Sequence, residues 1–477
     1  MDKLKERFTN MSAPAKAAIF FTLCNILQKG ISLISAPIFT RLLTTQQYGV
    51  YTIYNSWYSI ISIFATFNLS YGVFLTGLTK FEKDRERFTS ALMGLSTTIT
   101  GVLFVIYLLF KDFWNNLFEL STLIMVAMFT EMFFVPAFYF WSNIQRNTYK
   151  YKALVATTLG MSIANPLIGI VAVLLSEHKA EARIITSVFV QVCVGLVFYI
   201  LQAYRGKKLY VKKYWKYALA FNIPLIPHYL SMAALQQADR VMIGRMEGAT
   251  QAAIYGIAYT VSTLMTLITQ AINNSFTPFT YQSLKAEKYK DIGKIANLLL
   301  VLVGSGCICA MAFGPEIIRI FAPKEYYEAI WIIPPVSASV YFMFLYPLFG
   351  NIEFYFAKTK FTMLASCGGA VANIILNYIF IKRFGYLAAG YTTLVCYILF
   401  AVLHFIAYNN IRKTKLNQEV VYNIKFIIFF SMIVLIVMGF VLTIYNSYIV
   451  RYLLILVICI LLFLNRKKII KLLKEQK

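Results

Sequence analysis

The sequence predicts an all-α polytopic membrane protein with about fourteen transmembrane helices. Apolar stretches of roughly 17–25 residues recur along the chain, and each is long enough to cross a ~30 Å hydrocarbon core as a helix. The mean hydropathy is +0.66, and 59% of the 477 residues are hydrophobic while 14% are charged, against about 25% charged residues in a soluble domain. Because the apolar runs are continuous rather than alternating, they favour helices over a membrane β-barrel.

The predicted spans follow one another with only short polar connections. They lie at residues 17–39, 53–76, 88–110, 119–141, 153–175, 184–204, 217–238, 251–273, 294–314, 329–350, 361–381, 386–408, 424–445 and 449–465. The first span is longer than a signal-peptide core, contains Lys29 and lacks a small-residue cleavage site, so we expect it to be retained as a membrane helix.

The basic residues predict the orientation of the chain in the membrane. Of the 45 Lys and Arg residues, 33 fall on the side of the two termini and 11 on the other, with Lys29 assigned to neither. Basic connections stay in the cytoplasm, so both termini are expected there, in a plasma membrane. The net charge of +25 is thus explained by topology and by contact with anionic membrane lipids, and no nucleic-acid partner is predicted.

An internal repeat predicts how the helices are grouped. At an offset of 208 residues, seven identities fall within 23 positions, including Asn143-Ile144 with Asn351-Ile352 and Ala164-Asn165 with Ala372-Asn373; at an offset of 207, Tyr48-Gly49 matches Tyr255-Gly256. Both offsets correspond to a unit of six helices, so the two copies share one orientation, as in some alternating-access transporters. We therefore expect two six-helix lobes in parallel repeat, at 1–210 and 211–410, followed by two additional helices at 411–477.

Few ionisable side chains lie inside the predicted spans, and such residues are functional candidates. Lys29 is ~18 Å into the first span, too deep for its ~6 Å stem to reach the headgroups; it is either a cation lining a cavity or the partner of Glu131. Glu131, in the middle of span four, either pairs with a cation or is protonated after desolvation and carries a proton. His228, near the middle of span seven, is either a hydrogen-bonded core residue or a coupling group, whereas His404 is expected at the membrane interface.

Three charged residues close the first and seventh spans at roughly equivalent places in the two repeats: Arg41, Asp239 and Arg240. They are either headgroup anchors or parts of an outer gate. Asp239 and Arg240 should not bridge each other, because adjacent helix positions point ~100° apart.

Prolines occur in the same two spans, at Pro37, Pro224 and Pro227. A proline removes a helix hydrogen bond and bends the helix, so these residues are candidate gating positions.

The sequence offers no support for enzyme chemistry or a metal site. It contains no P-loop, GxSxG or HExxH motif, and its seven cysteines lie inside predicted spans without metal-binding spacing. We therefore predict no catalytic residues, no metal and no cofactor.

Two stretches resemble the Wzx-type lipid-linked oligosaccharide flippases, the polysaccharide transporter branch of the multidrug/oligosaccharidyl-lipid/polysaccharide exporter superfamily. The first comprises Asn25-Ile26-Leu27-Gln28-Lys29, Pro37, Thr40-Arg41-Leu42-Leu43-Thr44 and Tyr48-Gly49-Val50-Tyr51; the second comprises Phe221 to Ser231 and Asp239 to Gly244. The resemblance extends over essentially the whole chain.

The resemblance implies a cleft between two lobes, lined by spans one and seven, through which an undecaprenyl-diphosphate-linked repeat unit passes to the outer leaflet for surface polysaccharide (O-antigen or capsule) synthesis. Lys29 is then the first candidate for diphosphate contact and Arg41 and Arg240 are weaker ones; Glu131 and His228 are candidates for coupling to an ion or proton gradient. A polysaccharide polymerase and glycosyltransferases are implied as candidate partners. A multidrug/cation antiporter of the same superfamily is the first alternative, and a membrane glycan polymerase or ligase is a weaker one, since the outer loops are short.

Overall fold

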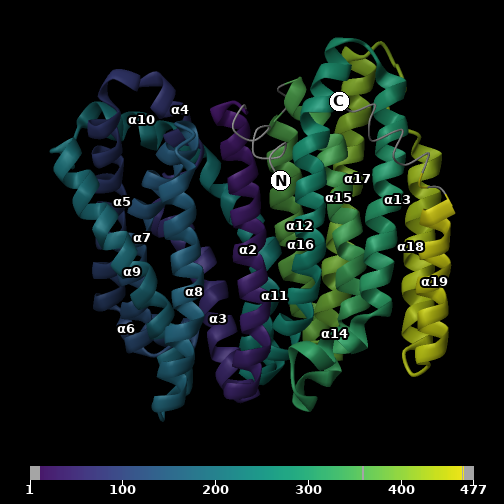
Figure 1. The fold of residues 1–477 in the computed structure, drawn as a ribbon, viewed down its shortest axis with the longest axis horizontal. Coiled ribbons are helices and arrows are strands. Elements are labelled where there is room, and N and C mark those ends of the chain that lie inside the picture. The colour runs from purple at the N-terminus through teal and green to yellow at the C-terminus, as the bar shows by residue number, and fades with distance from the viewer. Residues whose placement is uncertain (1–10, 357–358, 465, 467–477) are drawn as a thin grey trace, which may run out of the picture. The chain divides into compact units, whose positions relative to one another are not determined.

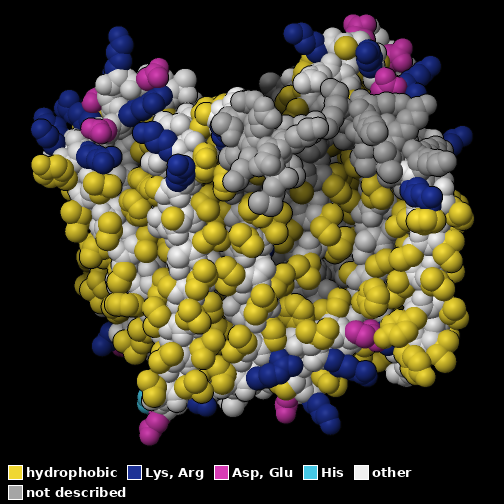
Figure 2. All heavy atoms as spheres, viewed as in Figure 1, with side chains coloured by type: hydrophobic (Ala, Val, Ile, Leu, Met, Phe, Trp, Pro, Cys, Tyr) yellow, Lys and Arg dark blue, Asp and Glu magenta, His cyan; other side chains and the backbone are white. Residues whose placement is uncertain are grey.

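The computed structural model describes residues 11–356, 359–464 and 466, without the side chains of residues 261, 263 and 359–362. All regular elements in this part of the chain are helices (Figure 1), so the predicted all-α membrane fold is confirmed. Hydrophobic side chains cover the middle of the face shown in Figure 2, whereas charged side chains gather at its two ends. The protein is therefore a multi-pass membrane protein.

Contacts within the chain divide it into Met1–Leu230 and Ser231–Lys477. The first unit holds α2 (Ala13–Leu42), α3 (Thr45–Thr66), α4 (Gly72–Lys80), α5 (Arg85–Leu109), α6 (Lys111–Phe118), α7 (Thr122–Asn147), α8 (Tyr151–Leu175), α9 (Lys179–Gly206) and α10 (Lys212–Asn222). The division falls inside α11 (Ile226–Glu247). The predicted lobe boundary at residue 210 stays a prediction.

The second unit holds α12 (Ala249–Lys285), α13 (Tyr289–Ala312), α14 (Gly314–Phe321), the 3₁₀ segment η3 (Lys324–Trp331), α15 (Ile333–Tyr355), α16 (Thr359–Phe384), α17 (Ala388–Lys415), α18 (Ile424–Ile444) and α19 (Tyr448–Leu464). Its core is built around α15 and α17, and α18 contributes Val434 and Val441 to the same apolar cluster. In this unit α18 is thus part of the packed core.

The two units share a local plan. In each, a short amphipathic helix, α6 or α14, precedes a strongly packed helix pair, α7 with α9 in the first unit and α15 with α17 in the second. These pairs correspond to predicted spans four and six, and ten and twelve. The arrangement agrees with the repeat seen in the sequence.

Eleven described helices are long and apolar enough to cross a membrane, or twelve if the bent helix α12 counts as one span. The described residues of every predicted span lie mainly on a helix or a pair of helices, but α3 falls outside this set and α19 has only 17 residues. The count of fourteen is therefore higher than the number of helices that meet this test.

The prediction for the second span is wrong in its limits. Helix α3 starts at Thr45 because Thr44 and Gln47 form a capping box, and it ends at Thr66 because Phe67 adopts a left-handed conformation (φ 48°). The predicted span 53–76 therefore contains the second half of α3, a turn and the beginning of α4.

The prolines act differently in the two helices. Around Pro224 the chain leaves the α-helix for a 3₁₀ turn, Ile223–Leu225, and Pro227 is the second residue of the helix that follows. The break is fixed by Asn222, which is fully buried and donates to the Phe67 carbonyl at 2.5 Å, at the end of α3. In contrast, α2 continues through Pro37 to Leu42.

Candidate functional site

The most completely organised buried charge is Asp239 on α11, whose side chain is 1% exposed. Its Oδ2 accepts hydrogen bonds from the hydroxyls of Tyr255 on α12 and Thr393 on α17, both at 2.7 Å, and its Oδ1 accepts one from the Asn377 amide on α16 at 2.6 Å. An ionised carboxylate in a membrane is costly unless such donors replace its water. Four helices therefore contribute to holding this one group.

Further oxygen atoms surround the same site. The Asn377 amide oxygen accepts a short hydrogen bond from the Thr392 hydroxyl, and its amide nitrogen also donates to Asn373 Oδ1 at 3.2 Å. We call Asp239, Tyr255, Asn373, Asn377, Thr392 and Thr393 the Asp239 cluster. Carboxylate, amide and hydroxyl oxygens are ligands for hard cations such as Na⁺. The carboxylate can instead bind a proton. Within the described residues, no group of three or more His, Cys, Asp or Glu side chains could hold a metal ion.

Arg240 follows Asp239 in sequence but faces other partners. Its Nη1 donates to the Gln236 carbonyl at 2.6 Å and to Gln237 Oε1 at 2.9 Å, and its guanidinium carbon lies 4.0 Å from the centroid of the Tyr259 ring. No ion pair joins Arg240 to Asp239 in the part of the chain that the structure describes, as expected for adjacent helix positions.

Glu131 is the corresponding buried carboxylate of the first unit. It is 3% exposed on α7, and it accepts from the Tyr54 hydroxyl of α3 and from the Gln191 amide of α9, both at 2.8 Å. These donors are neutral, and no described cation forms an ion pair with Glu131. The alternative that Lys29 is its partner is therefore not supported.

The sequence reasoning missed Arg183 as a buried cation. It lies on the first turns of α9 and is 6% exposed, with Nη1 donating to Asn165 Oδ1 at 2.9 Å and Nη2 to the Tyr51 hydroxyl at 3.3 Å. Its guanidinium carbon is 4.1 Å from the Phe39 ring centroid and 4.8 Å from that of Tyr51. A Cβ atom at Gly169 would lie 3.3 Å from Nη1, so glycine makes room for the charge.

The sequence contained a signal for the polar contacts around Arg183. Asn165 and Asn373 are matched by the 208-residue repeat, and both lie in polar clusters of their units. The chemistry differs, because the Asp239 cluster holds a carboxylate whereas Arg183 has no described carboxylate partner.

A second missed group is Glu353, which lies just beyond the predicted end of span ten. It is fully buried on α15, and its Oε1 is 2.7 Å from Nδ1 of His404 on α17. The expectation that His404 is interfacial is therefore wrong: its side chain is 0% exposed and packs 4.5 Å from both the Tyr346 and Phe400 rings. The interface prediction considered only distance along the helix and not the packing of α17 against α15.

The remaining candidates differ in exposure. Lys29 is exposed on α2, and Arg41 is exposed near the end of the same helix, where its Nη1 donates to the Pro37 carbonyl at 2.8 Å. His228 is half-buried, and its buried Nδ1 has no hydrogen-bond partner among the described residues. Lys29 and Arg41 are thus exposed, whereas Asp239, Arg240 and Glu131 are buried.

A family model described as a polysaccharide biosynthesis protein matches residues 15–281, more than half of the chain. The chain belongs to this family. A second model, MatE, matches residues 224–379. Together they confirm the resemblance to the polysaccharide branch of the exporter superfamily.

Individual relatives are more distant. The chain is 25% identical over 200 residues to "Lsg locus putative protein 1" of Haemophilus influenzae, a match that covers 39% of this chain and 48% of the relative. The match thus spans about half the length of the curated relatives, since a second H. influenzae protein, an "uncharacterized membrane protein", is covered to 46%.

Solved structures share the fold. The lipid II flippase MurJ in an inward closed conformation has a TM-score of 0.65 at 15% identity, covering 94% of this chain and all of that one. An inward-facing multidrug resistance transporter of the MATE family has a TM-score of 0.60 at 12% identity, covering 84% and 99%. At these identities the likeness concerns the fold alone.

Proposed function

We propose that this protein is a flippase that moves an undecaprenyl-diphosphate-linked oligosaccharide from the cytoplasmic to the outer leaflet of a bacterial inner membrane, by alternating access. The observation that carries the proposal is the polysaccharide biosynthesis family match over residues 15–281. The fold shared with a chain described as a lipid II flippase supports it. The basic-residue asymmetry supports a chain with both termini in the cytoplasm.

We further propose that Asp239 couples this movement to a cation or proton gradient. The Asp239 cluster contains one carboxylate and several neutral oxygens, a composition suited to binding one monovalent cation. Its donors come from α12, α16 and α17. Loading or release of a cation would change the hydrogen bonds between these helices and α11, which gives the gradient a physical means of favouring one conformation.

The diphosphate of the cargo requires a positively charged side chain that it can reach. Lys29 is our first candidate because it is exposed although it lies far from either end of α2. Arg41 is a second exposed candidate, and Arg240 a weaker one, since its guanidinium is buried against Tyr259. Glu131 and His228 stay candidates for proton transfer.

The experiment is export of the oligosaccharide in cells that lack their own flippase. Wild-type protein should restore surface polysaccharide, and Asp239→Asn should abolish it while still being produced in the membrane. Asp291→Asn is the matched control, because Asp291 is an exposed carboxylate paired with Lys294. Unimpaired export by the Asp239→Asn variant would contradict the coupling role, and no export by the wild type with any lipid-linked oligosaccharide would contradict the flippase proposal.

A second candidate function, a multidrug/cation antiporter, is favoured by the MatE match at residues 224–379 and by the MATE-family structural neighbour. The two candidates are separated by their cargo. An antiporter would raise the resistance of cells to cationic drugs, and Asp239→Asn would abolish that resistance. It would not restore polysaccharide export.

A further inference from the structure

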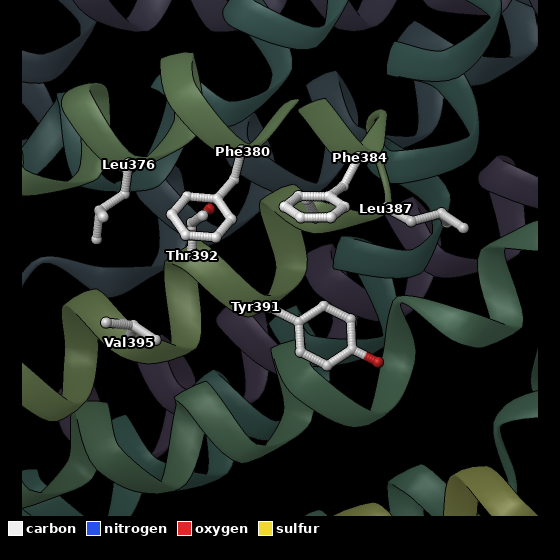
Figure 3. A pocket seen from close by; sticks show the side chains of 8 residues that line it. Leu376, Phe380, Phe384, Leu387, Tyr391, Thr392 and Val395 are labelled. Atoms are coloured by element: carbon white, nitrogen blue, oxygen red, sulfur yellow. The ribbon is translucent and has the colours of Figure 1, made fainter. Parts of the chain in front are cut away.

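A pocket of about 380 Å³ lies between α16 and α17 in the second unit. Its walls include Leu376, Phe380 and Phe384 on α16, four residues apart on one face of that helix, and Tyr391, Thr392 and Val395 on α17 (Figure 3). Phe384, Tyr391 and Val395 are 62%, 41% and 44% exposed. Both helices are long and apolar enough to span a membrane, so an exposed apolar hollow on them is suited to lipid hydrocarbon.

The chemistry of the walls selects an apolar occupant. Thr392 is 4% exposed. Its hydroxyl already forms hydrogen bonds with the Asn377 amide oxygen and, at 3.0 Å, with the Ala389 carbonyl. The hydroxyl is thus used inside the helix bundle. The rings of Phe380 and Phe384 stack with centroids 5.8 Å apart and form a continuous apolar wall.

Charge lies beside this wall. Helix α16 ends with Lys382 and Arg383, both exposed, and the Arg383 guanidinium carbon is 5.5 Å from the Phe384 ring centroid. The chain then turns at Gly385, whose φ of 76° suits glycine, before α17 begins. The basic pair therefore lies in the last turn of α16, where the pocket reaches the end of the helix; the ends of membrane-spanning helices are where lipid headgroups are expected.

Two carboxylates also lie at this turn. The Tyr386 hydroxyl donates to Glu328 Oε2 at 2.5 Å, and Glu247 lies next to Gly385. Both belong to segments packed against the turn itself, whereas Lys382 and Arg383 belong to the helix that lines the pocket. Neither basic residue has an ion-pair partner among the described side chains.

We propose that this pocket is a binding site for an anionic diacyl phospholipid, with an acyl chain between α16 and α17 and the phosphate at Lys382 and Arg383. The combination of an apolar hollow with adjacent exposed cations matches the two halves of such a lipid. The pocket adjoins the Asp239 cluster at Thr392, whose hydroxyl bonds within that cluster, and the proposed lipid site does not depend on the transported cargo.

The test measures lipid bound to the purified full-length protein by native mass spectrometry, with phosphatidylglycerol and phosphatidylcholine of identical chains. Val395→Trp fills the pocket, and Val402→Trp is the matched control: Val402 is 48% exposed and lies seven residues along the same helix, so it shares a face with Val395. We expect Val395→Trp to lose the tightest phosphatidylglycerol molecule and Val402→Trp to retain it.

The phosphate contact is tested by the double variant Lys382→Gln/Arg383→Gln. The control is the double variant Lys288→Gln/Lys290→Gln, which removes the same charge at the exposed start of α13. Each basic residue near the headgroups adds to the binding free energy of an anionic lipid. The Lys382/Arg383 variant should therefore weaken phosphatidylglycerol binding about tenfold or more, and the Lys288/Lys290 variant should not. All variants should keep the wild-type elution volume. Equal lipid retention by the two Trp variants would overturn the pocket, and equal affinity for the two lipids would overturn the phosphate contact.

Discussion

The ion pair between Glu316 and Arg451 provides a stability prediction that can be worked out from the structure. Arg451 on α19 is 3% exposed; its two terminal nitrogens donate to the two carboxylate oxygens of Glu316 on α14, at 2.6 and 2.7 Å, and Nη1 also donates to the Ala312 carbonyl at 2.7 Å. This pair connects α19 to the end of α13 and to α14.

Glu316→Gln should destabilise the protein by about 2 kcal/mol. Removing one partner of a buried ion pair costs roughly 3–5 kcal/mol, and the lower figure follows because the Glu316 side chain is 23% exposed. The measurement is unfolding by sodium dodecyl sulfate titration, with Glu325→Gln, a carboxylate of the neighbouring 3₁₀ segment, as the control. A change below about 0.5 kcal/mol, the usual range for surface substitutions, would refute this reasoning.

The same pair predicts a pH dependence. Burial by itself raises the pKa of Glu316, but hydrogen bonds from Arg451 outweigh it, so the pKa lies below its ordinary value of 4.5. A lowered pKa means that the stabilisation is complete above pH 4.5 and is lost as the pH falls through the lowered value. The difference between wild type and Glu316→Gln should therefore be full at pH 7 and shrink on further acidification below pH 4.5; a difference that stays constant would contradict the assignment.

Three further predictions concern the cargo site, packing and topology. Lys29→Ala should abolish oligosaccharide export from a folded protein while Lys29→Arg keeps part of it, and normal export by Lys29→Ala would remove Lys29 from the site. Gly195→Ala should lower stability by about 2–3 kcal/mol, because a Cβ there would lie 2.6 Å from a backbone oxygen of α7; Gly160→Ala, with nothing within 4 Å, should not, and equal effects would contradict the packing. Reporter fusions after Lys216 and Lys477 should both read cytoplasmic, and an external reading at either would overturn the topology.

Helix positions were predictable because lipid permits few alternatives for a backbone. An apolar run of sufficient length therefore identifies a helix without knowledge of its neighbours. The limits of α3 were missed because its start depends on a local capping signal at Thr44, which hydropathy does not detect. The two prolines of span seven were correctly predicted to disturb their helix, since that effect is also local.

The site was only half predictable. Asp239 and Glu131 stood out as carboxylates in apolar surroundings, but their partners are separated from them by 16 to 154 residues, and tertiary packing alone brings these together. Arg183 was counted with an outer loop and Glu353 lay beyond a predicted span end, so neither was considered as buried. Their enclosure results from helices α2, α8 and α17, whose arrangement one sequence does not specify.

Transport in proteoliposomes is the most direct test of the central claim, that Asp239 couples movement of a lipid-linked saccharide to a cation gradient. One elementary charge moved across 100 mV corresponds to about 2.3 kcal/mol, so a coupled wild-type protein should enrich a fluorescent undecaprenyl-diphosphate oligosaccharide roughly 40-fold in one leaflet. Asp239→Asn should leave the lipid evenly distributed, and Asp291→Asn should behave as wild type. Equal enrichment by Asp239→Asn, or none by the wild type under Na⁺ or proton gradients, would contradict the account.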